Sequence, residues 1–335
     1  MISLLACLFL LSSCNLNGVV AVGSDTSNPS NGSGGGSGVS CPSGYIALPS
    51  SVNTALGYSL CVAKYEMKVS QNDGTPVMDG RGSVALDPSL YKAVSRASGT
   101  PWTRILYSDA IAECSEIGTG YRLITNTEWN KIALDIESVA DNWSGGLLTS
   151  GHTDGAIDTN AVADGWSYTG NLLAAGSDSD GYEGTGNTSA QAFGSGGEQR
   201  RTLKLSNGEI IWDMSGNARE KVDADGQGGT ISYTGIGNFS ELNSTDMSNV
   251  VSSMLSSNAV SFSISDFTPS SASYTHSGEN IGMFYTNGGS NSLRILSRGG
   301  NMSSGNKPGL FAGDADEANT GLSSSGGFRC VYQTN

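Results

Sequence analysis

Residues 120–133 read GYRLITNTEWNKIA and contain the clearest helix start in the sequence. Thr125 is followed three residues later by Glu128, which is the spacing of a capping box at a helix N-terminus. The apolar residues that follow recur at three- and four-residue intervals, as on one face of a helix: Trp129, Ile132, Ala133 and Ile136. The pattern predicts a helix over 125–140 that buries this face in a core.

A second helix is predicted just upstream, at 107–117 (YSDAIAECSEI), with Ser108 as its N-cap. Its apolar face consists of Ala110, Ile111, Cys114 and Ile117. Nearer the N-terminus, residues 41–68 read as two short strands with a loop between them.

After about residue 141 the helical periodicity fades, and Gly, Asn, Asp and Ser dominate. Strand-like runs interrupt this region at 209–214 (EIIWDM) and 293–298 (LRILSR). A Ser-rich stretch at 240–275 is expected to be an insertion or a long loop. The sequence therefore predicts an α+β fold that is rich in loops, with two helices in its first half and short antiparallel strands.

The charge balance limits the class of partner. The 335-residue chain has 17 Lys and Arg against 31 Asp and Glu, a net charge of −14. Proteins that bind nucleic acid neutralise its phosphates with a surplus of basic residues, so a nucleic-acid partner is excluded. Cations or neutral ligands are better candidates.

The start of the chain has the composition of a secretory leader. Residues 2–13 (ISLLACLFLLSS) are apolar and uncharged, but shorter than the roughly 20 residues of a membrane-spanning helix. Leu11 to Cys14 (LSSC) resembles a bacterial lipobox, which implies that Cys14 is lipidated; the alternative is a plain secretory signal with an incidental cysteine. We expect a signal peptide at 1–14, a flexible Gly/Ser-rich tether at 15–40 and a folded domain at 41–335, held at the bacterial cell envelope, on the outer membrane or cell surface.

Four cysteines remain in the expected domain: Cys41, Cys61, Cys114 and Cys330. An even number in an exported protein predicts disulfides, and four cysteines allow three pairings. A Cys41–Cys61 bond would close the two-stranded segment at 41–68. No C-x-x-C pair is present, so a structural zinc site is not expected.

Several separated segments, in one order, resemble the formylglycine-generating enzyme (sulfatase-modifying factor) family, whose domain is a variant of the C-type lectin fold. They are CVAKYEM (61–67), PWTRILYSDAIAEC (101–114), GYRLITNTEWNKIA (120–133), IIWDMSGNARE (210–220), SRGGN (297–301) and GFRCV (327–331). The resemblance implies a Cys114–Cys330 disulfide. It also implies that Arg122, Trp129 and Arg329 serve the core and its buried polar contacts.

The family's chemistry is not expected in this chain. The family's oxidase holds copper with two cysteines, and Ser304 and Gly309 stand at those positions here. A related branch holds iron with three histidines, but the chain has only His152 and His276, both expected in exposed loops. We therefore expect neither copper nor iron, and no enzymatic activity.

Two segments resemble the family's calcium loops. In the first, at 170–184, the implied ligands are the side chains of Asn171 and Asp180 and the carbonyls of Leu172 and Tyr182. In the second, at 212–220, they are the carboxylates of Asp213 and Glu220 and the carbonyls of Gly216 and Ala218. Calcium prefers such oxygen ligands, so structural calcium is expected. The alternative is that the acidic runs at 178–181 and 223–226 are simple polar turns.

The resemblance places an exposed surface between the RGG and GFRC motifs. The candidate ligand-binding residues there are Asn301, Met302, Ser304, Asn306, Phe311, Asp314, Asp316 and Asn319. An exposed Phe or Met among polar groups suits ligand contact. The alternative is that Leu310 and Phe311 belong to the core and the rest is solvated loop.

We therefore expect a surface-anchored, non-enzymatic lipoprotein of adhesin type that binds a protein or glycan at the cell surface. Its layout also resembles lipoproteins diversified by retroelements, which vary this same region. One alternative is a structural or assembly protein of the envelope. Another is an oxidoreductase-like enzyme of the sulfatase-modifying factor family with altered chemistry.

Overall fold

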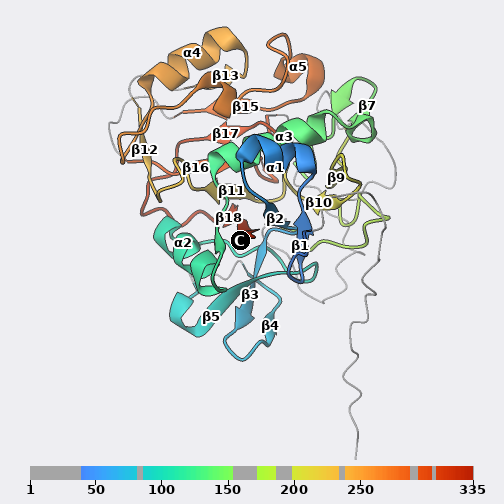
Figure 1. Ribbon diagram of the computed structural model, residues 1–335, viewed down its shortest axis with the longest axis vertical. Coiled ribbons are helices and arrows are strands. Elements are labelled where there is room, and N and C mark those ends of the chain that lie inside the picture. The colour runs from blue at the N-terminus through green and yellow to red at the C-terminus, as the bar shows by residue number, and fades with distance from the viewer. Residues whose placement is uncertain are drawn as a thin grey trace, which may run out of the picture. The chain divides into compact units, whose positions relative to one another are not determined.

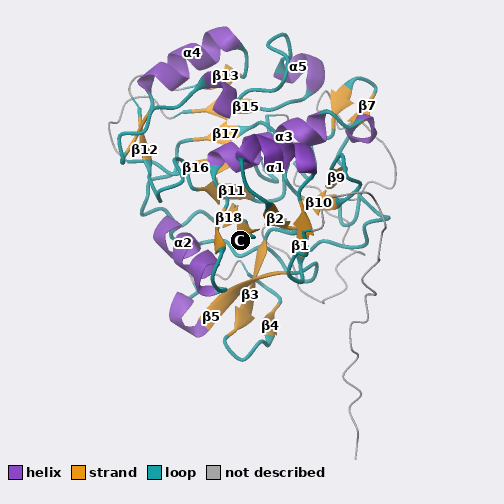
Figure 2. Ribbon diagram, viewed as in Figure 1, coloured by secondary structure: helices purple, strands orange, loops and turns teal. Residues whose placement is uncertain are grey.

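The computed structural model of the chain describes residues 39–80, 86–153, 172–185, 198–233, 238–286, 293–303 and 307–334 (Figures 1 and 2). The predicted signal peptide with Cys14, and nearly all of the predicted tether, lie outside these residues. Among the residues that are described, no helix has both the length and the apolar character needed to cross a membrane.

Helices are few and strands are short in the described ranges. The helices are α1 (Ser50–Leu56), α2 (Tyr107–Glu116), α3 (Asn126–Glu137), α4 (Ser244–Ser253) and α5 (His276–Glu279), with 3₁₀ turns η1 (Pro88–Leu90), η2 (Ala140–Asn142) and η3 (Ile264–Asp266). The strands are β1 (Tyr45–Ala47), β2 (Leu60–Ala63), β3 (Met67–Gln71), β4 (Pro76–Val77), β5 (Tyr91–Ser95), β6 (Tyr121–Leu123), β7 (Trp143–Ser144), β8 (Leu147–Leu148), β9 (Thr202–Lys204), β10 (Ile210–Trp212), β11 (Arg219–Val222), β12 (Ile231–Ser232), β13 (Phe239–Glu241), β14 (Leu255–Ser256), β15 (Met283–Tyr285), β16 (Leu296–Arg298), β17 (Gly313–Asp314), β18 (Gly326–Phe328) and β19 (Cys330–Gln333). The predicted mixed fold is confirmed at this level.

Two sheets organise the strands. One has the order β1-β2-β19-β6 and is antiparallel throughout, so a strand near residue 330 lies between two strands from the first half of the chain. The other has the order β13-β15-β17-β16-β11-β18. Its β11–β18 and β15–β17 pairs are parallel, which the expectation of antiparallel strands did not include.

Helix α3 begins as the sequence predicts. The Glu128 amide donates to Thr125 Oγ1 at 3.2 Å, and the Thr125 amide donates to Glu128 Oε2 at 2.8 Å, which completes the capping box. Arg122 Nη1 donates to the same Glu128 oxygen at 2.7 Å. Trp129 is fully buried, and its indole nitrogen donates to the Leu310 carbonyl at 3.1 Å. The roles expected for Arg122 and Trp129 are confirmed.

Two local predictions are wrong, and for the Ser-rich stretch, expected to be an insertion or a long loop, the long loop is excluded. Helix α2 has Leu106 at its N-cap position with no side-chain cap, because Ser108 already lies inside the helix. The segment between β1 and β2 is the helix α1, which ends at Gly57 in a left-handed conformation (φ 82°). The Ser-rich stretch is not one long loop. It contains β14, η3 and α4, whose Met247 and Val250 are buried, because its serines occupy the outer face of an amphipathic helix.

The expectation that both histidines lie in exposed loops is also wrong. His152 is completely buried and pairs in an isolated bridge with Gly216, where a Cβ would lie 2.4 Å from the His152 carbonyl oxygen. Only glycine allows this close approach, which brings the two loops together. His276 is buried at the start of α5, where its backbone amide donates to a Glu241 carboxylate oxygen at 2.7 Å.

Two disulfides are present, Cys41–Cys61 and Cys114–Cys330. The first closes the segment that contains α1. The second joins α2 to β19 across 216 residues of sequence. Both pairings match those expected from the sequence.

Removing the long-range disulfide should destabilise the protein more than removing the short-range one. The loop-entropy argument gives a loss of about 2–5 kcal/mol for Cys114→Ala with Cys330→Ala. The Cys41–Cys61 bond spans a sequence separation of only 20 residues. Its removal by Cys41→Ala with Cys61→Ala should therefore lower the free energy of unfolding by about 1–2 kcal/mol less than removal of the long-range bond. Urea unfolding without reductant measures both, and equal losses for the two pairs would contradict the ranking.

Candidate functional site

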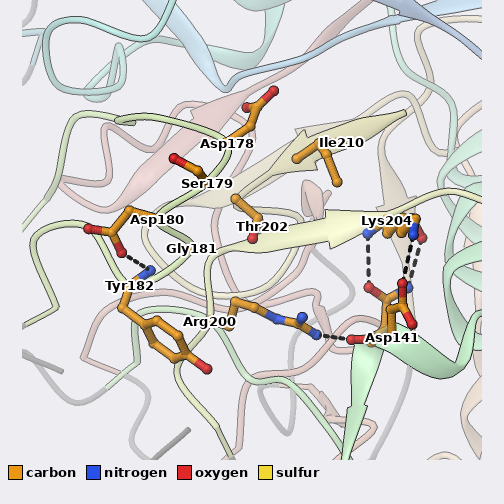
Figure 3. A pocket seen from close by; sticks show the side chains of 11 residues that line it. Asp141, Asp178, Ser179, Asp180, Gly181, Tyr182, Arg200, Thr202, Lys204 and Ile210 are labelled. Atoms are coloured by element: carbon orange, nitrogen blue, oxygen red, sulfur yellow. Dashed lines mark hydrogen bonds and ion pairs between the residues drawn. The ribbon is translucent and has the colours of Figure 1, made fainter. Parts of the chain in front are cut away.

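A polar cleft of about 410 Å³ opens beside β9 (Figure 3). One wall is the loop at 178–182, and the other comes from the strand pair β9–β10 and the turn η2. The residues that line it are Asp141, Asn142, Asp178, Ser179, Asp180, Gly181, Tyr182, Arg200, Thr202, Lys204 and Ile210.

Local turn chemistry fixes the loop wall. Asp180 Oδ1 accepts a hydrogen bond from the Tyr182 amide at 3.0 Å, a turn in which a carboxylate replaces a backbone acceptor. Gly181 presents its carbonyl to the Arg201 amide at 2.7 Å. A Cβ on Gly181 would lie 2.4 Å from Thr202 Oγ1, so a larger residue here would have to displace the Thr202 and Arg200 side chains.

Opposite charges alternate around the cleft. Lys204 Nζ lies 2.6 Å from Asp141 Oδ2, and Arg200 Nη2 donates to the Asp141 carbonyl at 2.5 Å. The hydrogen bond from Lys204 holds the pKa of Asp141 below its ordinary value. Asp178 accepts from the Trp212 indole nitrogen at 2.9 Å and pairs with Lys64 at 2.5 Å. The cleft therefore offers fixed acceptors, fixed donors and, at Tyr182, one aromatic ring.

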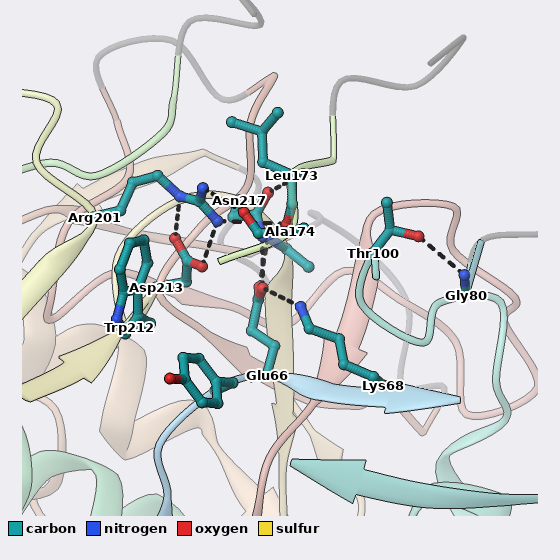
Figure 4. A network of polar contacts seen from close by, with 12 residues as sticks. Glu66, Lys68, Gly80, Thr100, Leu173, Ala174, Arg201, Trp212, Asp213 and Asn217 are labelled. Carbon is teal, nitrogen blue, oxygen red and sulfur yellow. Dashed lines mark hydrogen bonds and ion pairs between the residues drawn. The ribbon is translucent and has the colours of Figure 1, made fainter. Parts of the chain in front are cut away.

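A buried ionic cluster contacts the segments on either side of the loop at 178–182, and Figure 4 shows four of its members, Glu66, Lys68, Arg201 and Asp213. In the described part of the chain it contains three carboxylates and three cations, all almost completely buried: Glu66, Asp213, Glu220, Lys68, Arg201 and Arg329. Arg201 joins the cluster to the cleft. Its guanidinium donates to both Asp213 oxygens at 2.8 and 2.7 Å. It also donates to the carbonyls of Ala174 and Glu183, which lie on either side of the loop at 178–182.

Arg329 makes the matching contact on the other side of the cluster. Its guanidinium donates to both Glu220 oxygens at 2.8 and 2.5 Å, and to the carbonyls of Ala63 and Trp212. The structural role expected for Arg329 is confirmed. Its neighbour Cys330, the first residue of β19, forms the disulfide with Cys114.

Glu66 and Lys68 complete the cluster. Glu66 accepts the Ala218 amide at 2.8 Å and the Asn217 side-chain amide at 2.5 Å, and its Oε2 lies 3.9 Å from Lys68 Nζ. Burial raises the pKa of Glu66 to about 8, with the Asp213 charge adding to the effect. Burial lowers the pKa of Lys68 to about 8. Burial therefore disfavours the charged form of both side chains.

The structure describes only part of the first expected calcium loop. Asn171 lies outside the described residues, and Leu172 is buried against Ala218 and Met302. Asp180 is exposed in the cleft wall, and the Tyr182 carbonyl accepts the Thr185 amide and hydroxyl at 3.0 and 2.7 Å. Calcium at this loop stays a prediction.

The residues of the second expected calcium loop do lie together, in and just after the β10–β11 connection. Their two carboxylates, Asp213 and Glu220, already have both oxygens bonded to arginines, so a metal ion would have to displace a guanidinium to bind them. Gly216 and Ala218 lie between them in the chain. Within the described ranges no group of three or more His, Cys, Asp or Glu side chains is placed to hold a metal, a finding that does not address calcium held by carbonyls.

The segment after RGG differs most from expectation. Met302 and Phe311 are buried, Phe311 completely, because Phe311 belongs to the main core and Met302 packs on Leu172. They cannot act as exposed anchors, and the alternative of a core Leu310 and Phe311 is confirmed. Gly309 packs so closely that a Cβ would lie 2.4 Å from the Gly282 nitrogen.

The polar residues of that segment differ in their contacts and in their exposure. Asp314 pairs with Arg219 Nη1 at 2.7 Å, and its neighbour Glu317 pairs with the buried Lys221 at 3.2 Å. Asn301 and Asp316 are half-buried and Asn319 is exposed, while Ser304 and Asn306 lie outside the described residues. Of the predicted ligand-binding residues that the structure describes, only Asn319 is exposed.

Sequence reasoning missed most of the cleft. Arg200, Thr202 and Lys204 alternate along and just before β9, which is the two-residue period that puts side chains on one face of a strand. This alternation in the sequence could have indicated that the three side chains share one face of a strand. The contribution of Asp141 and Asp178 could not be predicted in this way, because these residues reach the cleft only through tertiary folding.

Comparisons with known proteins add little to this picture. No family profile matches the chain, and no curated protein matches it. One solved structure that is similar is titled "Major Tropism Determinant P3c Variant", at 13% sequence identity and a TM-score of 0.36. The match covers 88% of this chain and 53% of that one, so this chain spans about half the length of the structure it matches.

Breaking the Arg201–Asp213 pair should strongly destabilise the fold. Arg201→Met leaves Asp213 buried without its counter-charge, a change that costs about 3–5 kcal/mol. Asp213→Asn added to Arg201→Met should recover part of the loss, because the uncompensated charge is then absent. Arg200→Gln is the control, with an expected loss below about 1 kcal/mol for a half-exposed arginine. Denaturant unfolding measures all three, and a loss for Arg201→Met no larger than the control's would contradict the prediction.

Proposed function

We propose that this chain is a non-enzymatic, ligand-binding module of the bacterial cell envelope, and that its ligand binds in the cleft beside β9. The observation that carries the proposal is the cleft itself. Its volume of about 410 Å³ lies within the usual range of small-molecule sites, and its polar groups are held in place by bonds within the protein. This moves the binding site away from the segment after RGG, whose expected anchors are buried.

The lining of the cleft favours a ligand rich in hydroxyl groups, such as an oligosaccharide. A hydroxyl group both donates and accepts hydrogen bonds, so it is matched by carboxylates and cations set side by side, as Asp141, Lys204 and Arg200 are. The Tyr182 ring offers a flat apolar surface beside them. Like the acidic chain as a whole, the cleft has more aspartates than basic residues, which disfavours anionic ligands.

The charge state of the cleft supports binding rather than catalysis. A general acid works best with a pKa near the working pH. Lys204 holds the pKa of Asp141 below its ordinary value, so Asp141 stays ionised at neutral pH. One carboxylate oxygen of Asp178 accepts a hydrogen bond from Trp212, and the other pairs with Lys64. Such carboxylates suit the acceptance of hydrogen bonds from a ligand.

The proposal extends to the fold type. We propose a C-type lectin-like fold of the formylglycine-generating-enzyme kind for the domain at 41–335. The order of the sequence motifs supports it, as does the Cys114–Cys330 disulfide, which that resemblance implies and the structure contains.

Tyr182→Ala should weaken binding of the best ligand from a glycan array by about tenfold or more, which is about 1.4 kcal/mol. The backbone carbonyl and amide that shape the turn are kept in this variant. Tyr91→Ala, a half-buried tyrosine on β5 outside the cleft, is the matched control. Isothermal titration with the full chain measures both. If no glycan binds, or if both variants bind as the unaltered protein does, the cleft proposal is wrong.

Membrane attachment is a separate part of the proposal and is tested separately. Cys14→Ser removes the proposed acylation site, so the variant should leave the membrane fraction and appear in the soluble fraction after cell fractionation. Cys7→Ser, a cysteine within the apolar leader, is the control and should stay membrane-bound. Retention of the Cys14→Ser variant in membranes would refute the anchor.

A further inference from the structure

The side chain of Arg201 bridges the two loops that resemble calcium sites (Figure 4). Its Nε donates to Asp213 Oδ1 at 2.8 Å, and its Nη2 donates to Asp213 Oδ2 at 2.7 Å. Nη1 donates to the carbonyls of Ala174 and Glu183 at 2.7 and 2.8 Å, and Nη2 also donates to the Leu173 carbonyl at 3.4 Å. A carboxylate of the second expected loop and three carbonyls of the first therefore meet at one guanidinium group.

These oxygens match the donors of a guanidinium group. An arginine side chain has one N–H at Nε and two at each Nη, fixed in a planar fork. Arg201 makes one contact through Nε and two through each Nη. This almost completely buried side chain thus has one oxygen for each of its N–H groups, which is what a buried cation needs in order to be stable.

The surroundings fit a flat organic cation better than a metal ion. Arg201 Cζ lies over the Trp212 ring, 5.2 Å from its centroid, so an indole ring covers one face of the guanidinium. Calcium needs about six to eight oxygen ligands distributed around it, and an aromatic ring supplies none. A calcium ion in this place would lose ligands on the side of the ring and would have to displace the guanidinium.

Arg201 also holds the segment between its two side-chain contacts. Its backbone amide donates to the Gly181 carbonyl at 2.7 Å, while its side chain binds the carbonyls of Ala174 and Glu183. The segment 174–183 is therefore fixed at both ends and once in between by a single residue. Irregular backbone needs donors for its carbonyls, and one arginine supplies them here.

We propose that Arg201 takes the place of a calcium ion between the two loops, so that the segment 174–183 is held without metal. The oxygen cage is a site for a guanidinium cation, which the chain itself supplies. Calcium occupancy depends on the free calcium concentration, whereas an arginine side chain is always present and always charged. The cleft wall would then keep its shape in calcium-poor surroundings, whether or not a glycan binds there.

Amide hydrogen exchange of the full chain, with and without a calcium chelator, tests the proposal. The amides of Ala175 and Thr185 report on the two ends of the segment, because each donates to a backbone carbonyl, at 2.9 and 3.0 Å. We expect the chelator to leave exchange at both amides unchanged, with the Trp129 amide in α3 as the internal reference. Faster exchange at either reporter in chelator, reversed when calcium is restored, would overturn the proposal.

A variant with added guanidinium tests the cation site itself. Arg201→Ala removes the guanidinium, so exchange at the two reporter amides should become roughly 100-fold faster, as expected when a buried charge loses its partner. Guanidinium chloride, below the concentration that unfolds the protein, should slow exchange again by filling the cage. Urea, a neutral molecule of similar planar shape, is the matched control at equal ionic strength and should not.

Equal slowing by urea, or no slowing by guanidinium, would overturn the assignment of a cation site. The unaltered protein still tests the dependence on calcium if Arg201→Ala fails to fold.

Discussion

The ion pair between Arg329 and Glu220 is the contact on which the arrangement of the other elements depends. Arg329 is completely buried, and its guanidinium donates to the carboxylate of Glu220 on β11 and to the carbonyls at the ends of β2 and β10. A single guanidinium therefore joins β2, from the first half of the chain, to the successive strands β10 and β11. The pair holds because each charge is satisfied, since a buried charge without its partner would destabilise the fold strongly.

A second buried arginine of the cluster, Arg201, bonds to loop carbonyls in the same way as Arg329 bonds to strand carbonyls. Long irregular segments lack the regular hydrogen bonds of helices and sheets, so their carbonyls need other donors. Arg201 supplies them by bonding to two carbonyls of the cleft loop while it pairs with Asp213. The acidic loops that resemble metal sites are thus held, in part, by arginine. Through Arg201, the buried cluster thus fixes the backbone next to the cleft wall.

The features that the sequence predicted correctly are those with a local or covalent signature. Thr125 and Glu128 form a capping box because both partners lie within one helical turn. The burial of His152 and Phe311 was missed because it depends on which distant loop covers them. The cleft was missed for the same reason: Asp141 and Asp178 reach it from separate segments. Motif order carried the disulfide between Cys114 and Cys330, which spacing alone left open.

The position of β19 between β2 and β6 has a consequence for the order of folding. Strands β2 and β6 do not pair with each other, so their sheet stays incomplete until residues 330–333 arrive. Contacts that span most of the chain form slowly, because the intervening segment must be brought together first. The domain is therefore expected to complete its fold only after β19 has been synthesised. Until β19 inserts between β2 and β6, a chain with this topology lacks the closed sheet that would resist its passage through a narrow opening.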